Sequence, residues 1–439
     1  MNTIQTYFSC DGMTSLKSLL PGSCVHVIGV CGVAMAPLAV ALAEQGFQVS
    51  GSDKEFYEPM AGLLRKSRVD IKQGYKSENI PIDAKLVVVG NAVTSNNPEV
   101  VAVAGRSLAY TCFPACLFDL MIRTRHSIVV AGTHGKSTTT MMGASALAAL
   151  EADPSFFVGA LPVDYDTGFR LGHGAFSIVE GDEYDSCFFA KVPKFLFYNP
   201  QTVIITGIEF DHADIYQNLD DICLQFRKLI ELLPDGGLCV YCSDSPALSE
   251  LVANAKTNSK DGKNITYSSY GVGEDAQWRV SKVEPNEGRI KATITCLGEP
   301  EFEVTLPVVG MHNLLNALAV SIALENRGFK REEVWQSLKS FKGIRRRQDV
   351  RLNNDRVTII EDFAHHPTAV KETIRAVKGA YPIRRLVAVF EPRSNTSRRS
   401  VFKSEYEKAF SEADLVLIQE VQKRGSDLSE EILNVRELC

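Results

Sequence analysis

The chain has 439 residues, of which 45% are hydrophobic and 23% are charged, and its net charge is −6. This composition indicates a globular protein of about three domains, and the weak negative charge excludes a general attraction to nucleic acid. No apolar run reaches the ~18 residues of a membrane span, and the N-terminus lacks the basic start and apolar core of a signal peptide. The 11 cysteines are scattered, which suits a reducing cytoplasm rather than a disulfide scaffold.

The first predicted unit is a strand, a glycine loop, a helix and a second strand, over residues 24–28, 29–35, 36–45 and 47–50. This order is typical of dinucleotide-binding folds, but the loop departs from G-x-G-x-x-G at Cys31 and Ala34. A helix N-terminus that grips a diphosphate is a related use. Asp53 follows the second strand and is either near a ribose or base or simply a turn residue. A buried strand over 86–89 then leads into a polar loop over 90–98, at the strand end where such sheets bind ligands.

The motif that organises the chain is Gly132-Thr-His-Gly-Lys-Ser137. It follows a buried strand predicted over 127–131 and precedes a helix predicted over 138–150. Backbone N–H groups at such a turn hold nucleotide phosphates, the Lys136 ammonium adds a positive charge, and the Ser137 hydroxyl can bind Mg²⁺. The general phosphate-loop pattern has a glycine where Val130 stands. The alternative is a plain strand-to-helix turn with a surface lysine.

Acidic side chains and a histidine follow two further strands, predicted over 176–180 and 202–206. Glu180 ends the first of them, downstream of the phosphate loop, where an acidic residue usually completes a magnesium site. The second strand leads into Glu209-Phe-Asp-His-Ala-Asp214. This loop either holds a hard cation, orients a substrate amine, or is only a solvated polar loop.

Residues 256–306 alternate between polar and apolar side chains at period two, which predicts an antiparallel layer. A helix over 317–326 follows. Asn313 and Asn316 lie three positions apart on one helical face, and their amides suit the edge of a purine. N-capping of the helix is the alternative role for Asn313.

The third predicted unit repeats strand, polar loop and helix. Its strands are expected over 357–360, 386–390 and 415–418, with a helix that starts at about residue 368. Pro367 stands near the first helical position, where proline is favoured. The loop after the first strand contains Asp362, His365 and His366, and the loop after the second contains Arg393.

Taken together, these loops resemble the Mur ligase family, the ATP-dependent enzymes that join amino acids or peptides to the peptidoglycan precursor. The resemblance covers nearly the whole chain from Val25 onward. It is carried by five short motifs in the family's order, which are Gly132-Thr-His-Gly-Lys-Ser-Thr138, Glu180-Gly-Asp-Glu-Tyr-Asp185, Glu209-Phe-Asp-His212, Gly310-Met-His-Asn-Leu-Leu-Asn316 and Asp362-Phe-Ala-His-His-Pro367.

The resemblance implies an α/β fold of three domains. A Rossmann-like domain that binds the UDP-sugar is expected over 1–122. A central phosphate-loop ATPase domain with an added antiparallel layer is expected over 123–343, and a second Rossmann-like domain over 344–439. This last domain is expected to be shortened, because the family's version continues with another strand and a glycine-rich loop. Residues 1–23, before the first strand, form a segment that the family usually lacks.

The implied reaction forms an amide bond in two steps, with ATP and Mg²⁺ as cofactors. A muramoyl carboxylate attacks the γ-phosphate of ATP to give an acyl phosphate, and a peptide amine then displaces phosphate. The expected partners are therefore the small-molecule substrates UDP-N-acetylmuramate and a murein tripeptide. No nucleic acid or membrane partner is expected, and the protein should be a cytoplasmic monomer or weak homodimer.

The resemblance also carries roles to single residues. The catalytic set is Lys136, His212, Arg346 and His365. The ATP-binding set is Gly132, Thr133, His134, Gly135, Lys136, Ser137, Thr138, Asn313, Asn316, Arg346 and Asp362. The UDP-sugar set is Gly29, Val30, Cys31, Gly32, Val33, Asp53 and Asn91. The peptide-binding set is His365, His366, Arg393, Ser394 and Asn395, and the metal ligands are Ser137, Glu180 and His212. For each of the three arginines from Arg345 to Arg347, a solvated basic linker is the alternative.

Two kinds of family member share the Ala-His-His-Pro motif found here at 364–367. One adds L-alanine to UDP-N-acetylmuramate, and the other adds the tripeptide L-alanyl-γ-D-glutamyl-meso-diaminopimelate during peptidoglycan recycling. The stretches 180–189, 209–216 and 390–396 look more like the tripeptide enzyme. The alternative hypothesis, based on the short third domain, is that the protein is not an enzyme but binds a nucleotide and a UDP-sugar without ligase activity.

Overall fold

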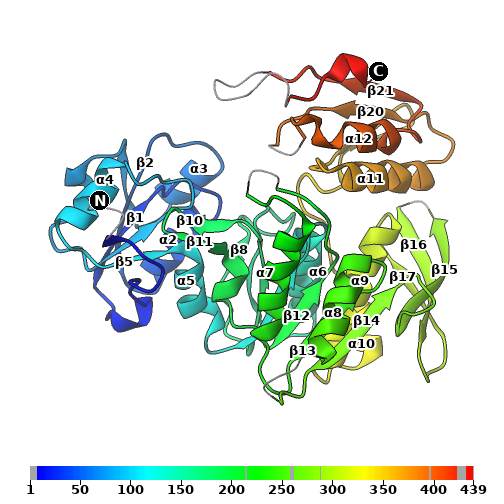
Figure 1. Ribbon diagram of the computed structural model, residues 1–439, viewed down its shortest axis with the longest axis horizontal. Coiled ribbons are helices and arrows are strands. Elements are labelled where there is room, and N and C mark those ends of the chain that lie inside the picture. Colours follow the sequence, from blue (N-terminus) through cyan, green and yellow to red (C-terminus); the bar gives the residue numbers. More distant parts are fainter. Residues whose placement is uncertain are drawn as a thin grey trace. The chain divides into compact units, whose positions relative to one another are not determined.

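The computed structural model describes residues 7–212, 215–257, 262–286, 288–394, 397–422 and 432–438 (Figure 1). The chain divides into two compact units by its own contacts. The N-terminal unit contains Met1–Ala131, Glu151–Leu161 and Tyr165–Thr202, and the C-terminal unit contains Gly132–Leu150, Pro162–Asp164 and Val203–Cys439. The domain bounds expected from the sequence, 1–122, 123–343 and 344–439, stay a prediction.

A five-stranded parallel sheet forms the first part of the N-terminal unit. Its strands are β1 (Cys24–Ile28), β2 (Gln48–Asp53), β3 (Asp70–Gln73), β4 (Leu86–Val89) and β5 (Tyr110–Cys112). They lie in the order β3-β2-β1-β4-β5, and every neighbouring pair is parallel. β1 and β4 are buried at every position, as expected for strands covered on both faces. The predicted strand–loop–helix–strand unit is therefore confirmed, and β2 runs on through Gly51 to Asp53.

Short helices connect these strands. They are α2 (Met35–Glu44), α3 (Met60–Arg65), α4 (Pro98–Gly105) and α5 (Phe113–Leu117), with the shorter turns η1 (Leu16–Ser18), η2 (Ser77–Asn79) and η3 (Phe118–Ile122). α4 shows why the chain turns helical where it does. The Asn97 side chain caps its N-terminus by accepting a hydrogen bond from the Glu99 N–H, and Pro98 occupies the first helical turn.

The segment before β1, which has no clear sequence pattern, packs on this sheet. The Phe8 ring is 5% exposed and lies 4.5 Å from the Tyr110 ring, centroid to centroid. The Tyr7 hydroxyl donates to the Leu108 carbonyl at 2.6 Å. Two aromatic side chains therefore anchor this segment beside β5.

Further strands complete the N-terminal unit. β6 (His126–Ala131), β9 (Phe176–Glu180), β7 (Ser155–Phe157) and β8 (Phe169–Arg170) follow one another across a sheet. β6 and β7 both pair with β9 in parallel, and β8 pairs with β7 antiparallel. A separate hairpin, β10 (Asp185–Cys187) with β11 (Ala190–Pro193), precedes the turn η4 (Lys194–Phe197). The predicted strand over 176–180 has the observed bounds.

The C-terminal unit contains β12 (Thr202–Ile205), β13 (Leu238–Cys242), β14 (Thr266–Gly271), β15 (Trp278–Asn286), β16 (Arg289–Cys296) and β17 (Phe302–Leu306), in this spatial order. The prediction that 256–306 is wholly antiparallel is wrong for its first strand. β14 pairs with β13 in parallel, because α8 (Pro246–Thr257) crosses over between them. Only β15, β16 and β17 form the antiparallel layer.

The described helices of this unit that come before residue 340 form two groups. α6 (Lys136–Ala149), α9 (Met311–Glu325) and α10 (Arg331–Leu338) pack on one another, and α7 (Leu219–Glu231) packs on α8. α9 is buried at nearly every position from Leu314 to Leu324, so it is a core helix rather than an amphipathic one. It begins at Met311, earlier than predicted, and Gly310 is its N-cap. Capping by Asn313 is therefore wrong.

The orange-to-red end of the chain in Figure 1 forms a small α/β layer within the C-terminal unit. Its elements are β18 (Asp349–Asn353), β19 (Thr358–Glu361), α11 (Pro367–Ala380), β20 (Val387–Phe390), η5 (Ser400–Phe402), α12 (Lys403–Ala409), β21 (Leu415–Ile418) and η7 (Val435–Glu437). Pro367 starts α11 and β21 has its predicted bounds, while β18 was not predicted. Phe390 is 8% exposed and packs with Tyr406, whereas Val389 is 78% exposed, so the described helices cover one face of β20. Among the described residues, no helix combines the length and apolar character needed to cross a membrane.

Candidate active site

The phosphate loop, residues 132–137, has a backbone that only glycine adopts easily at two positions. Gly132 has φ +130° and Gly135 has φ +80°. A Cβ at Gly132 would collide with the Thr206 hydroxyl. α6 begins directly after Gly135, which is its N-cap and supplies no capping side chain. The sequence therefore builds a turn that fits a phosphate anion, with main-chain N–H groups and a helix N-terminus close to it.

Hydrogen bonds tie this loop to the segment after β12. The Thr133 N–H donates to the Gly207 carbonyl at 2.9 Å. The Thr133 hydroxyl accepts from the Glu209 N–H at 2.9 Å and donates to the Glu209 carbonyl at 3.2 Å. The Lys136 ammonium donates to the Gly132 carbonyl at 2.7 Å, so its charge lies over the loop. These hydrogen bonds fix the position of the loop relative to the 207–209 segment.

The residues expected near adenine lie along a chain of contacts. Asn313 Nδ2 donates to Gln348 Oε1 at 3.0 Å, and the Gln348 N–H donates to Asp362 Oδ2 at 2.7 Å. Burial raises the pKa of Asp362 above its ordinary value. Asn316 Nδ2 lies 3.4 Å from Asn313 Oδ1, and a Cβ on Gly135 would lie 2.8 Å from Asn316 Oδ1. The structure therefore brings Asn313, Asn316 and Asp362 together beside the phosphate loop.

The three predicted metal ligands are divided between the two units. Ser137 is in the first turn of α6 and is 5% exposed. Glu180 ends β9, where its Oε2 accepts a hydrogen bond from the Gly159 N–H at 2.7 Å. His212 has φ +56°, and its Nδ1 lies 3.8 Å from Asp211 Oδ1. Hydroxyl, carboxylate and imidazole groups are a donor set that suits a divalent cation.

Arg346 is the arginine of the triplet 345–347 that the family resemblance assigned to ATP binding and catalysis. Its backbone has φ +61°, and its guanidinium pairs with Glu361 at 3.0 Å while remaining 60% exposed. Its neighbour Arg347 lies over the Phe363 ring, 5.1 Å from the centroid. Arg346 and Arg347 therefore contact Glu361 and Phe363, which lie close to them along the chain. The role of Arg346 in ATP binding stays a prediction.

The predicted peptide-binding residues lie around the N-terminus of α11 and after β20. His365 Nδ1 is 3.1 Å from the Phe363 carbonyl, and burial lowers the pKa of this imidazole. The Ser394 hydroxyl donates to the buried Ser397 hydroxyl at 2.9 Å, which closes the turn after the exposed Arg393. Asn395 lies outside the described residues. The peptide-binding role of these residues stays a prediction.

The residues expected to bind the UDP-sugar lie together in the N-terminal unit. The strand order of its sheet reverses between β1 and β4, and ligands of such sheets bind at this reversal. The loop with Gly29, Gly32 and Val33 follows β1, and Asn91 follows β4. The Gly90 N–H donates to the Ile28 carbonyl at 3.0 Å and joins the two strand ends.

The residues of this UDP-sugar set differ in their exposure to solvent. Val30 and Cys31 are fully buried, and their N–H groups donate to the Ser52 carbonyl and the Asp53 carboxylate. A role for these two residues in binding the UDP-sugar stays a prediction. Asp53 Oδ2 accepts a hydrogen bond from the Cys31 N–H, and its Oδ1 accepts one from the Tyr75 hydroxyl at 3.1 Å. The Asp53 carboxylate therefore shapes the glycine loop from within the protein.

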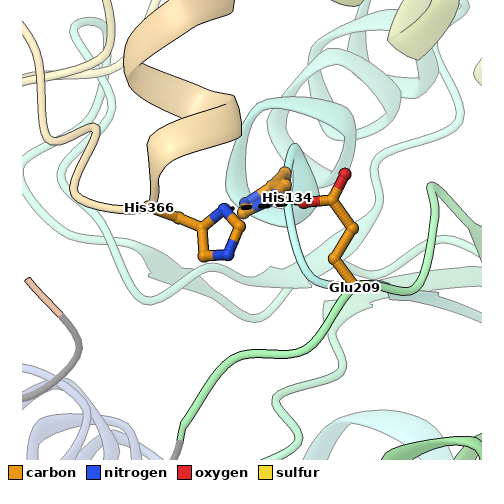
Figure 2. A group of neighbouring side chains, drawn as sticks. All are labelled: His134, Glu209 and His366. Carbon is orange, nitrogen blue, oxygen red and sulfur yellow. Dashed lines mark hydrogen bonds and ion pairs between the residues drawn. The ribbon is translucent and has the colours of Figure 1, made fainter. Parts of the chain in front are cut away.

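Figure 2 shows a group that the sequence did not predict, formed by His134, Glu209 and His366. His134 comes from the phosphate loop, Glu209 from the segment after β12, and His366 from the loop that enters α11. His134 Nε2 lies 3.2 Å from Glu209 Oε2, and His366 Nδ1 lies 3.5 Å from the same oxygen. Two imidazoles and a carboxylate are ligands that a cation can bind. Whether the group binds a cation or forms hydrogen bonds depends on which of the ring nitrogens carry protons.

Hydrogen bonds account for this group without a metal. His366 Nδ1 accepts from the Thr368 N–H at 3.3 Å and so caps α11, while its Nε2 donates to the Phe210 carbonyl at 3.2 Å. Burial lowers the pKa of His366 to about 4, which keeps the ring neutral at pH 7. Glu209 Oε2 also accepts from the Thr368 hydroxyl at 2.7 Å. Burial opposes the charge on Glu209, but hydrogen bonds from His134 and Thr368 bring its pKa to about 2.

Sequence reasoning missed Glu209, Thr368 and Gln348. Glu209 stands inside one of the five motifs, but the resemblance assigned a role only to His212 of that motif, as a metal ligand. Thr368 is an ordinary first-turn residue, and Gln348 follows a basic run. Only their partners, 75, 159 and 35 residues away along the chain, reveal what they do.

Three family models match nearly the whole chain in sequence order. They are described as "Mur ligase family, catalytic domain" over residues 24–125, "Mur ligase middle domain" over 130–324, and "Mur ligase, glutamate ligase domain" over 345–437. Their order agrees with the three domains that the motifs predicted.

Individual relatives give the same result. The chain is 34% identical to the UDP-N-acetylmuramate–L-alanyl-γ-D-glutamyl-meso-2,6-diaminoheptandioate ligase of Escherichia coli (strain K12), over 90% of this chain and 84% of the relative. Among solved structures, it is similar to a murein peptide ligase of Psychrobacter arcticus 273-4, with a TM-score of 0.72 and 30% identity over 90% of this chain and 84% of the other.

A second solved relative is named for a different activity. The chain is similar to the UDP-N-acetylmuramate–alanine ligase of Thermotoga maritima, with a TM-score of 0.74 and 25% identity over 91% of this chain and 85% of that one. Sequence identity above 30% over most of both chains, together with all three domain matches, decides the assignment. The chain belongs to the Mur ligase family.

Proposed function

We propose that the chain is an ATP-dependent ligase that joins L-alanyl-γ-D-glutamyl-meso-diaminopimelate to the carboxylate of UDP-N-acetylmuramate. The observation that carries the proposal is the 34% identity, over 90% of this chain, to the Escherichia coli ligase named for that reaction. The glycine-based phosphate loop supports it, because transfer of the γ-phosphoryl group of ATP to a carboxylate requires that the nucleotide phosphates be held in place.

The proposed reaction proceeds in two steps. A carboxylate oxygen of UDP-N-acetylmuramate attacks the γ-phosphorus of ATP, a P–O bond forms, and ADP leaves. The amine nitrogen of the tripeptide then attacks the acyl carbon, and the tetrahedral intermediate collapses with release of phosphate and loss of the amine proton. The protein supplies position and charge rather than a nucleophile.

The chain's own residues would act as follows. Lys136 would leave the Gly132 carbonyl and bind the β- and γ-phosphates. The N–H groups of the 132–135 turn other than that of Thr133, which donates to the Gly207 carbonyl, would hold the phosphate oxygens. Asn313, Asn316 and Asp362 would hold the adenosine. Mg²⁺ bound by Ser137, Glu180 and His212 would neutralise phosphate charge.

The N-terminal unit and the third-domain loops would orient the two other substrates. The loops after β1 and β4, with Gly29, Gly32 and Asn91, would hold the UDP part. His365 and Arg393 would face the tripeptide, where the Arg393 guanidinium suits a carboxylate.

A second candidate is the addition of L-alanine to UDP-N-acetylmuramate. The structural similarity to the Thermotoga maritima enzyme favours it, although the sequence identity of 25% is lower than that to the tripeptide enzymes. The two activities share the phosphate loop and the UDP-sugar loops, so only the acceptor distinguishes them.

An acceptor screen tests the proposal. Phosphate release should be measured with UDP-N-acetylmuramate, ATP and Mg²⁺ and with L-alanine, the dipeptide or the tripeptide as acceptor. We expect turnover that requires the tripeptide. Equal turnover with L-alanine alone would move the assignment to the second candidate, and tight ATP binding without product from any acceptor would leave a binding protein.

A further inference from the structure

One carboxylate oxygen in the C-terminal unit connects three separate segments. Glu209 Oε2 lies 3.2 Å from His134 Nε2 of the phosphate loop and 2.7 Å from the Thr368 hydroxyl in the first turn of α11. It also lies 3.5 Å from His366 Nδ1. Figure 2 shows that the two imidazoles and the carboxylate point toward one another from three different chain segments.

The backbone around Glu209 makes the same connection. Its N–H and carbonyl both bond to the Thr133 hydroxyl, at 2.9 and 3.2 Å. The next residue, Phe210, accepts a hydrogen bond from His366 Nε2 at 3.2 Å. The 209–210 segment therefore binds the phosphate loop on one side and the His365-His366-Pro367 turn on the other.

The donors present in the group favour a hydrogen-bond centre over a cation site. The Thr368 hydroxyl can only donate to a charged carboxylate oxygen, which removes one lone pair from any metal. His366 Nδ1 accepts the Thr368 N–H, so its lone pair is also used. The remaining contact is between His134 and Glu209, a charge-assisted hydrogen bond.

We infer that Glu209 is a positioning residue that holds the peptide-facing His365-His366-Pro367 turn against the phosphate loop. Its carboxylate makes the placement of the acceptor loop depend on the placement of the nucleotide loop. Removing it should weaken binding of the acceptor, whose loop loses its support. Binding of ATP should change less, because the Thr133 N–H still donates to the Gly207 carbonyl and the Thr133 hydroxyl still donates to the backbone carbonyl of residue 209. This inference rests on the proposed function for the peptide-facing role of the turn and for its kinetic test, whereas the connection between the two loops does not depend on it.

Hydrogen exchange tests the connection without any acceptor. The variants are Glu209→Ala, and Thr368→Val, which is isosteric and deletes the hydroxyl donor. The matched control is Glu412→Ala, which removes a carboxylate partner of α11 at the exposed Arg375, 3.1 Å away. In the nucleotide-free protein and with a non-hydrolysable ATP analogue, amides of residues 368–371 should exchange about tenfold faster in both variants than in wild type. The control should exchange as wild type does.

Kinetics then separates positioning from general damage. In Thr368→Val, the KM for the tripeptide should rise about tenfold, as expected for the loss of one hydrogen bond to a charged group, while the KM for ATP stays within about twofold. Thr368→Ser should restore the KM, because it restores the hydroxyl. Equal changes in both KM values, or no rescue by serine, would contradict the inference.

Two further results would overturn it. One is unchanged exchange at 368–371 in both variants. The other is a stoichiometric Zn²⁺ or Mn²⁺ that wild type binds by itself and Glu209→Ala does not, since the group would then be a metal site. A wild-type protein that fails to use the tripeptide would refute the proposed function, while the exchange experiment would still decide the role of Glu209.

Discussion

The Asp53 carboxylate and the Cys31 N–H are joined by a hydrogen bond of 2.8 Å that closes the glycine loop after β1. The sequence left Asp53 either as a ligand contact or as a turn residue. The structure shows a third role, which is to fix the conformation of the loop. Asp53 Oδ2 accepts a hydrogen bond from the loop backbone, and its Oδ1 accepts one from the Tyr75 hydroxyl. The residue at the end of β2 thus determines the shape of the loop at the end of β1.

This relationship predicts the effect of Asp53→Ala. The substitution removes the acceptor for the Cys31 N–H, so the loop loses its shape and UDP-N-acetylmuramate should bind about tenfold more weakly. Binding of ATP should not change, since the phosphate loop belongs to the other unit. Calorimetric titration of both ligands measures this, with the exposed Asp70→Ala on β3 as the control. Unaltered affinity for the UDP-sugar would refute the role.

Lys136→Ala should abolish phosphate release, with a loss of at least about a hundredfold, because it removes the positive charge beside the β- and γ-phosphates. The folded state should persist, since Lys136 is at the first position of α6, where alanine is tolerated. Phosphate release at saturating substrates measures the effect, with the exposed Lys339→Ala as control. Activity retained by the Lys136 variant would disprove the assigned role.

Gly132→Ala should lose nucleotide binding and lower the free energy of unfolding by roughly 1–3 kcal/mol. The reason is twofold: φ is +130°, and the added Cβ collides with Thr206. Gly105→Ala provides the contrast, because a Cβ there meets nothing within 4 Å and the residue ends α4. That change should be neutral or stabilise by about 0.5 kcal/mol. Urea unfolding of both variants is the measurement, and equal costs would argue against a special loop conformation.

Glu99 should make the stability of the N-terminal unit depend on pH. Its side chain is fully buried and accepts hydrogen bonds from Asn79 Nδ2 at 2.7 Å and from Ser52, with His26 Nε2 at 3.4 Å. Burial alone would raise the pKa of Glu99, but the bonds from His26, Ser52 and Asn79 bring it below its ordinary value.

A carboxyl with a lowered native pKa stabilises the fold above its unfolded pKa, about 4.3, and this stability is lost as pH falls through the native pKa. Glu99→Gln should therefore cost about 1–3 kcal/mol at pH 7, and the difference from wild type should shrink below about pH 4.3. Unfolding in urea at several pH values measures it, with the exposed Glu44→Gln as control. A difference that does not vary with pH would contradict the prediction.

Much of the fold follows from local sequence. β9 has its predicted bounds because a buried parallel strand is a short apolar run that ends at a polar residue or glycine. β21 also has its predicted bounds, although Leu415 and Leu417 are exposed, because its run of four apolar residues lies between Asp414 and Gln419. The direction of β14 did not follow, because a period-two pattern reports exposure on alternate sides and says nothing about the neighbouring strand. The start of α9 was predicted too late, because the polar residues His312, Asn313 and Asn316 interrupt the apolar pattern in its first two turns.

The candidate site divides in the same way. The sequence by itself determined the phosphate loop, because glycines, a lysine and a hydroxyl must be consecutive to form one turn around an anion. The family resemblance assigned Asn313, Asn316 and Asp362 to one ATP site, and the structure shows that they lie together through Gln348. The tertiary structure alone decided that Asp53 shapes its neighbouring loop and that Glu209 joins His134 to Thr368. These contacts join segments that are 22, 75 and 159 residues apart, and a hydrogen bond depends on distance in space, which the order of residues along a chain does not contain.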